Sequence, residues 1–330
     1  MAMSSIPSPH NFDASAPVIG CVDGSSRSRE VALVAAHYAA SVDRPLILYH
    51  VIEHFGDPAE LPDPIEWKLR RQAAFLELGR LRDSLPEQSG EVLLEFNEGD
   101  WLTALADRVG ETDALLVIGA PGSDEAATTA GRVAMLVAHA APASLLLVPA
   151  GYAPNIGARP RIAVPIDGSN FAEMALAEAM RLARQLGAEL LLIHVVPEAG
   201  MTDFGPPAIH DLELRVRLDR RNEQAAIYFL ETTRRRLIDQ GYMVRSLCLK
   251  GDTRTALLRA LSEEAPDLVI MSAKGQGGKR CNDLSIGGTA SYLLDHLNGL
   301  IMLVRPSHDA MARRQPIPHG PHDPKQGHSA

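Results

Sequence analysis

The chain has 330 residues, which suits two domains of ordinary size, and 46% of them are hydrophobic, enough to build substantial cores. Its formal net charge of −9 disfavours nucleic acid or an anionic membrane surface as the main partner. Cys21, Cys248 and Cys281 show neither metal-site spacing nor an even disulfide framework, which fits a reducing compartment. No basic segment followed by an apolar one opens the chain, so we expect no signal peptide and a cytoplasmic protein.

The first half of the chain alternates predicted strands and helices. Residues 1–16 are rich in Ser and Pro and are expected to be disordered, and the first domain is expected over 17–150. Most of its strands are continuous apolar runs, as occurs when helices cover both faces of a parallel sheet. Ser26 or Ser28 is positioned to cap the first helix. We predict the strands near residues 18–22, 46–52, 91–95, 115–118 and 144–148.

The second half repeats this order after a linker rich in Gly, Pro and Ala at 151–160. We expect the second domain over 161–305 and a disordered tail over 306–330, with Asn170 as a helix cap. The predicted strands lie near 162–166, 189–196, 243–249, 268–272 and 300–304.

A long helix is predicted between the second and third strands of this half, from about Asp211 to Gln240. It is dense in arginine, which indicates either an anion-binding patch or a solvated face, and the interleaved acidic residues favour the solvated face. The arginines concerned are Arg215, Arg217, Arg220 and Arg221.

One stretch without charged residues, 133–153, has the length of a membrane span. Pro142 and Pro149 interrupt it, and the equivalent stretch of the second half carries Asp295. A helix followed by a buried strand is therefore predicted, and no membrane partner is expected.

The most informative motif of the sequence occurs twice. Segment 18–25 (VIGCVDGS) returns at 162–169 (IAVPIDGS), and each copy is an apolar run that ends in Asp-Gly-Ser. Segment 98–100 (EGD) likewise returns at 250–252 (KGD). A repeat of this length indicates a duplicated domain rather than a solenoid unit. We therefore expect an α/β protein with two doubly wound domains, each a five-stranded parallel sheet of order 3-2-1-4-5 with helices on both faces.

A glycine-rich loop follows the fourth strand of the second half. Gly275, Gly277 and Gly278 would let backbone N–H groups turn toward a ligand. Gly287 and Gly288 then open a helix whose N-terminal amides favour an anion. The basic residues of the same loop are Lys274, Lys279 and Arg280. Together these features predict a phosphate-binding loop, with a flexible linker as the alternative.

One carboxylate and two histidines at the ends of predicted strands are candidate functional residues. Asp167 would face the same crevice, because ligands bind at the carboxyl ends of the strands of an open sheet. It would hydrogen-bond a nucleoside base or ribose, and capping of the first helix is an alternative that can coexist. His50 and His194 end the second strands without a Ser or Cys nucleophile signature, so a hydrogen-bonded histidine is favoured over a general base.

Both halves resemble the universal stress protein family, arranged in tandem. The resemblance rests on Asp23 and Asp167 after the first strands, on the loops after the fourth strands, and on the glycines that open the next helix. It covers about residues 17–150 and 160–305. Some members of that family bind ATP in this crevice and others do not.

The resemblance implies a site for an adenine nucleotide in the second half. Pro165 and Val195 would line the adenine pocket, although without the family each would simply be a core residue at a strand end. The residues expected to bind the nucleotide are Pro165, Asp167, Val195, Gly275, Gly277, Gly278, Gly287, Gly288 and Thr289.

The first half departs from the family pattern. In the family, a Gly-x-x-Gly loop is followed after about nine residues by Gly-Ser or Gly-Thr at a helix start. Here segment 119–122 (GAPG) is followed after eight residues by Gly131 and then by Arg132, which stands where the family has the hydroxyl residue. Asp124 and Glu125 place two carboxylates in the loop, and these work against an anion. We therefore expect this crevice to be degenerate.

The second half departs less. Ser272 stands at the first glycine position, which is tolerable unless its φ is positive. Eleven residues, rather than the nine of the family pattern, separate Gly275 from Gly287. The two extra residues would either bulge outward or displace the start of the helix. Gly288 takes the hydroxyl position, with Thr289 next, so the backbone cradle is kept while the hydroxyl contact is open.

From these observations we expect a regulatory stress-response protein without fast chemistry. It would bind ATP, with or without Mg²⁺, mainly in the second domain, and the first domain would be structural. The alternatives are a nucleotide-free interaction module and a slow ATP hydrolase. Fast hydrolysis is disfavoured, because a Walker Gly-Lys-Ser/Thr sequence and a clear metal-binding carboxylate pair are missing. The edges 144–148 and 300–304 would pair internally as a pseudo-dimer, with a homodimer also open.

Overall fold

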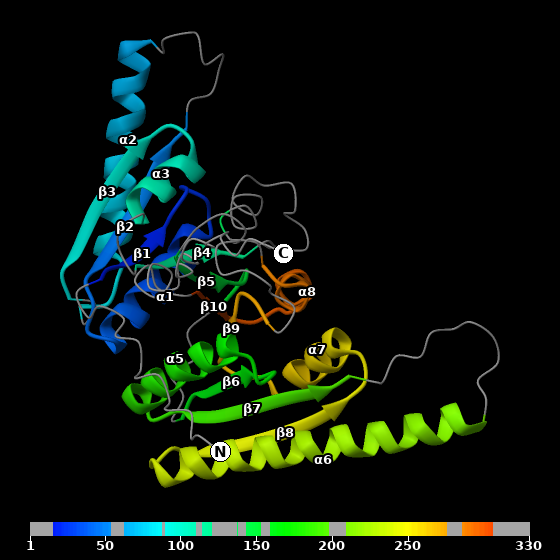
Figure 1. Cartoon of the computed structure of the whole chain (residues 1–330). Helices are drawn as coiled ribbons and strands as arrows, with labels where there is room; N and C mark the ends of the chain where they lie inside the picture. The colour runs from blue at the N-terminus through cyan, green and yellow to red at the C-terminus, as the bar shows by residue number, and fades with distance from the viewer. Residues whose placement is uncertain are drawn as a thin grey trace, which may run out of the picture.

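Strands and helices alternate through both halves of the computed structural model (Figure 1). The first half contains β1 (Val18–Cys21), α1 (Ser28–Ser41), β2 (Leu46–Ile52), α2 (Pro64–Asp83), β3 (Val92–Glu98), α3 (Trp101–Val109), β4 (Leu115–Gly119) and β5 (Ser144–Val148). The second half contains β6 (Arg161–Pro165), α5 (Asn170–Leu186), β7 (Glu189–Val196), α6 (Ile209–Asp239), β8 (Val244–Lys250), α7 (Thr253–Glu264), β9 (Leu268–Ser272), α8 (Gly288–His296) and β10 (Ile301–Val304). The structure describes residues 16–53, 63–87, 90–109, 114–120, 137, 143–152, 159–197, 209–275 and 286–305.

The strands form one continuous sheet of order β3-β2-β1-β4-β5-β10-β9-β6-β7-β8. The predicted order 3-2-1-4-5 is confirmed within each half, where all pairings are parallel. The two halves join through the antiparallel pair β5–β10, in which Leu146 lies opposite Met302. The predicted internal pairing of these two edges is therefore confirmed, and it fuses two five-stranded sheets into a single ten-stranded one.

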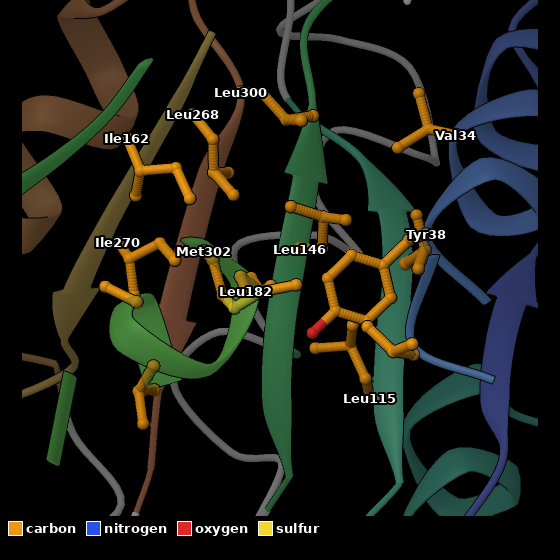
Figure 2. Close-up of a cluster of buried hydrophobic side chains, with 14 of the residues drawn as sticks. Val34, Tyr38, Leu115, Leu146, Ile162, Leu182, Leu268, Ile270, Leu300 and Met302 are labelled. Atoms are coloured by element: carbon orange, nitrogen blue, oxygen red, sulfur yellow. The ribbon is translucent and has the colours of Figure 1, made fainter. Parts of the chain in front are cut away.

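Helices cover both faces of this sheet and bury two hydrophobic cores. Successive strand residues point to opposite faces, so Val18 belongs to one core and Ile19 to the other. Helices α1, α2, α5 and α6 contribute to the first core, and α3, α7 and α8 to the second. Both cores run across the seam between the halves. Figure 2 shows this for the first core, where Leu146 of β5 lies between Tyr38 of α1 and Met302 of β10.

A polar cluster crosses the seam within the first core. The Tyr38 hydroxyl of α1 donates to Glu178 Oε1 of α5 at 2.9 Å and accepts from Arg181 Nη2 at 3.0 Å. Arg181 also donates to both carboxylate oxygens of Glu178. Tyr38 and Glu178 are buried, and desolvation together with the Glu178 charge raises the pKa of Tyr38 well above its usual 10.0.

The predicted caps of the first helix in each half are wrong. Helix α1 begins after Arg27 without a side-chain cap, and the hydroxyl of Ser28 instead accepts from the backbone of Asp23 and Gly24. Helix α5 is capped by Ser169, which accepts from the backbone N of Ala172, so the cap lies one residue before the predicted Asn170. Propensity alone does not distinguish neighbouring Ser and Asn, because backbone geometry decides which side chain reaches the free amides.

Candidate functional site

A cleft of about 1120 Å³ opens at the carboxyl ends of β6, β7 and β9. Parallel strands bring these ends to one edge of the sheet, where ligand sites of open α/β sheets are found. Gly277 and Gly278 lie outside the described residues, so the structure says nothing of their place. The other predicted binding residues all line the cleft: Pro165, Asp167, Val195, Gly275, Gly287, Gly288 and Thr289.

The turn after β6 brings a carboxylate to the floor of the cleft. Gly168 has a φ of +77°, and the backbone N of Ser169 donates to Asp167 Oδ1 at 2.9 Å. A Cβ added to Gly275 would lie 2.7 Å from Asp167 Oδ2, so only a glycine lets the loop after β9 pass this close to the carboxylate. The two chain segments that the sequence singled out therefore meet in space.

The loop after β9 returns to the cleft where α8 begins. The backbone N of Gly287 donates to the Ala273 carbonyl at 2.8 Å, which joins the two ends of the loop. Helix α8 begins at Gly288, as predicted, and no side chain of the described residues caps it. Residues 276–285, which carry the two-residue excess of this loop, lie outside the described residues. The φ of Ser272 is not positive, so a serine is tolerated at this position.

The other side of the cleft is largely apolar. Val195, Ala226 and Phe229 line it from β7 and α6. His194 Nδ1 lies 2.7 Å from the Ile166 carbonyl, and its ring meets that of Phe229 edge-on at 5.9 Å between centroids. The favoured interpretation of a hydrogen-bonded histidine is therefore confirmed for His194.

Sequence analysis missed residues that α6 and α7 add to the cleft, namely Phe229, Thr253 and Arg254. Asp252 Oδ1 accepts from the backbone N of Thr255 at 3.0 Å, and these hydrogen bonds lower the pKa of Asp252. This cap starts α7 so that its first residues face the cleft. The repeated Gly-Asp pair before α3 and α7 was the signal that could have identified them.

The first half carries a large side chain at the position of a threonine that lines the cleft in the second half. Trp101 is equivalent to Thr253, because each follows a Gly-Asp pair as the first residue of its helix. Trp101 is buried, and its ring centroid lies 6.4 Å from that of Tyr49 and 6.3 Å from that of His50. His50 in turn places Nδ1 2.7 Å from the Val22 carbonyl, as His194 does in the second half.

Three more side chains distinguish the first crevice. Arg27 is buried and donates to the carbonyls of Ala120 and Val148, at the ends of β4 and β5. Glu77 of α2 approaches Gly24, whose Cβ would lie 3.2 Å from Glu77 Oε2. At the matching place in the second half, Gly168 faces the ring of Phe229. Burial raises the pKa of Cys21 at the end of β1 to about 12, so its thiol stays protonated.

Asp23 also forms only local hydrogen bonds among the described residues that surround it. Its Oδ1 accepts from the backbone N of Ser25 at 3.0 Å and from the Ser28 hydroxyl at 3.1 Å. The predicted departures at Gly122, Asp124, Glu125, Gly131 and Arg132 lie outside the described residues. The contrast between the halves therefore rests on Arg27, Glu77 and Trp101 of the first half and on the residues that line the cleft of the second half.

Three further findings concern the arginines of α6, membrane-spanning helices and metal binding. Arg215 lies 4.0 Å from Asp219 one turn along α6, which supports the solvated helix face. In the part of the chain that the structure covers, no helix combines the length and apolar character needed to cross a membrane. Among the same residues, no group of three or more His, Cys, Asp and Glu side chains is arranged to hold a metal ion.

Comparison with known proteins gives a consistent result for both halves. The model of the universal stress protein family matches residues 16–149 and again residues 159–305. Universal stress protein YxiE of Bacillus subtilis is 26% identical over 146 residues, which are 44% of this chain and 97% of that protein. A universal stress protein of Archaeoglobus fulgidus has a TM-score of 0.63 at 16% identity, covering 90% of this chain and 98% of its own.

A universal stress protein of Arabidopsis thaliana, solved with AMP bound, matches 46% of this chain and 94% of its own, with 12% identity and a TM-score of 0.32. That ligand is a property of the plant protein. The two family matches cover most of the chain, in the two halves that the repeat delimits. The chain therefore belongs to the universal stress protein family, with two family domains in tandem.

Proposed function

We propose that the cleft of the second half binds an adenine nucleotide, with ATP as its ligand, and that the protein acts as a nucleotide-responsive regulator in the stress response. The observation that carries this proposal is the meeting of Asp167, the loop after β9 and the start of α8 at one cleft. A single cleft thus offers a carboxylate, an apolar wall and a helix N-terminus, which match the three chemically distinct parts of a nucleotide.

The base and ribose would occupy the strand ends of the cleft. Asp167 is an acceptor that suits the ribose hydroxyls or the exocyclic amine of adenine. Val195 and Phe229 provide an apolar surface on which a purine ring can pack, and aromatic side chains stack well with bases. Pro165 lines the cleft at the carboxyl end of β6 and contributes apolar surface without a backbone N–H.

The phosphates would lie at the start of α8. The backbone N–H of Gly287 is taken by the Ala273 carbonyl, whereas no side chain of the described residues caps the amides of α8 from Gly288 on, and the helix dipole favours an anion at this end. The close approach of Gly275 to Asp167 leaves no room for a side chain between the sugar end and the phosphate end.

We further propose that the first half has a structural role and that the protein does not turn ATP over rapidly. Trp101 fills the first crevice, and Glu77 adds a carboxylate beside the turn after β1, which opposes a phosphate. Slow hydrolysis of bound nucleotide is compatible with this proposal, whereas turnover near 1 s⁻¹, an ordinary enzymatic rate, contradicts it.

Titration calorimetry with ATP tests this assignment in matched variants. Asp167→Ala is expected to weaken ATP binding about 10- to 100-fold, because it removes a charge-assisted hydrogen bond. Asp23→Ala, the same change in the first half, is expected to leave the affinity unchanged. Loss of binding in Asp23→Ala alone would reverse the assignment of the halves, and a wild-type protein that binds no adenine nucleotide would refute the proposed function.

A further inference from the structure

Arg254 stands at the phosphate end of the cleft on a helix that the glycine loop does not include. It is the second residue of α7, and it lines the cleft together with Thr253. Helices α7 and α8 pack against each other, and both contribute buried leucines to the second core. The packing brings the first turn of α7 beside the first turn of α8.

The guanidinium of Arg254 occupies the space directly outside the first residue of α8. A Cβ added to Gly288 would lie 2.6 Å from Arg254 Nη2 and 3.4 Å from its Cζ. The φ of Gly288 is not positive, so backbone conformation does not require glycine at this position. The absent side chain therefore leaves room for the arginine beside the first residue of α8, and a Cβ there would push the guanidinium aside.

No acidic side chain within the described part of the chain forms an ion pair with Arg254. The nearest carboxylate in sequence, Asp252, is hydrogen-bonded by the backbone and hydroxyl of Thr255 at the start of α7, and the charge of Arg254 makes only the smallest contribution to the lowered pKa of Asp252. Arg254 is exposed to solvent at the cleft and belongs to no ion pair among the residues described. A guanidinium so placed retains its donors for an anion that enters the cleft.

The first half supplies an internal comparison. The residue equivalent to Arg254 is Leu102, which packs against the second core beside the buried Trp101. The arginine thus occurs in the half with the open cleft, and an apolar residue replaces it where tryptophan fills the crevice. This pairing of charge with open space indicates a role in ligand binding rather than in helix packing.

This inference rests on the proposed function. We propose that Arg254 is the residue that selects for the phosphate chain of the nucleotide, and that the missing side chain of Gly288 gives Arg254 the room to reach that chain. The planar guanidinium offers parallel N–H donors, which match two oxygens of one phosphate group. The site then discriminates ATP and ADP from adenosine through a side chain of α7. The ligand class is a nucleoside polyphosphate whose terminal groups lie beside both Arg254 and the start of α8.

Calorimetry with ATP and with adenosine, on the full chain, tests this role. Arg254→Leu, which installs the residue of the first half, is expected to weaken ATP binding about 10- to 100-fold, the loss typical of a hydrogen bond to a charged group. Adenosine affinity is expected to stay within about twofold, since the base and ribose contacts remain. Arg259→Leu is the matched control, because Arg259 is an exposed arginine of the same helix outside the cleft lining and should leave both affinities unchanged.

A double-mutant cycle tests the link to Gly288. Gly288→Ala is expected to weaken ATP binding in the wild-type background, because its Cβ displaces the guanidinium, and to have no further effect in Arg254→Leu. Equal losses of ATP and adenosine affinity in Arg254→Leu, or additive effects in the double variant, would overturn the role of Arg254 while the proposed function stands. A wild-type protein that binds neither ATP nor adenosine would refute both.

Discussion

The two halves of the sheet share strand order, pairing and helix positions, but their carboxyl-end crevices differ in what occupies them. In the second half Thr253 and Phe229 line an open cleft, and Arg254 stands at its mouth. In the first half the equivalent residue is Trp101, whose buried ring packs against Tyr49 and His50. A duplicated fold can thus keep its framework while equivalent positions carry a buried ring in one half and a cleft-lining residue in the other.

The largest expected effect tests whether Trp101 is a filling residue. Trp101→Ala should lower the free energy of unfolding by about 3–5 kcal/mol, because it removes a buried ring and leaves a cavity against Tyr49 and His50. Urea denaturation followed by circular dichroism measures the change. Trp67→Ala is the control, since Trp67 is only half-buried on α2 and should cost less. Equal losses in both variants would mean that the first crevice is not held closed by Trp101.

The reverse substitution tests whether the second half is open for a ligand. Thr253→Trp should place an indole in the cleft and weaken ATP binding at least about 100-fold, with little change in stability because the space is already present. Calorimetry measures the affinity and thermal unfolding the stability. Ser262→Trp, on an exposed position of the same helix, controls for adding a tryptophan. Unchanged ATP affinity in Thr253→Trp would place the ligand elsewhere.

The smallest expected effect concerns the seam, where the halves also differ. Tyr38→Phe removes the hydroxyl that donates to Glu178 and accepts from Arg181, and it should lower the free energy of unfolding by about 1–2 kcal/mol near neutral pH. Tyr228→Phe, which removes the same group from an exposed ring, should have no effect. Denaturant titration at several pH values measures both.

The pH dependence of this effect has a definite sign. The folded protein raises the pKa of Tyr38 well above 10.0, so the folded state holds this proton more tightly than the unfolded state does. The associated stability is therefore present below pH 10.0 and is lost as the pH rises toward the folded pKa. The difference in stability between wild type and Tyr38→Phe should shrink above that pH. A difference that grows with rising pH would contradict the buried hydrogen bond to Glu178.

Local sequence predicted much of the framework. Buried parallel strands appear as continuous apolar runs, so β4 and β5 could be placed to within a residue or two. Asp-Gly-Ser after β1 and β6 marked the turns that carry Asp23 and Asp167. The glycines before α8 marked the start of that helix, because glycine-rich backbone and helix N-termini recur at anion sites.

Other parts of the site could not be predicted from the same signals. Arg254 and Thr253 are ordinary residues of a helix start, and their place in the cleft follows from how α7 packs on α8. Phe229 is one of many apolar residues in a 31-residue helix, and only the position of α6 over β7 turns it toward Gly168. These contacts join segments that are distant in sequence, so no local pattern encodes them.

Periodic burial and residues with special backbone freedom are local signals, so the duplication, the strand order of each half and the chain segments that meet at the cleft could be predicted from the amino-acid sequence. Only three-dimensional packing placed the Trp101 ring against Tyr49 and His50 and placed Thr253 in the lining of the second-half cleft. It also decided that Arg254 and Gly288 share one space. The physical reason is that packing density is set by side chains from several elements at once, and a local pattern contains only one of them.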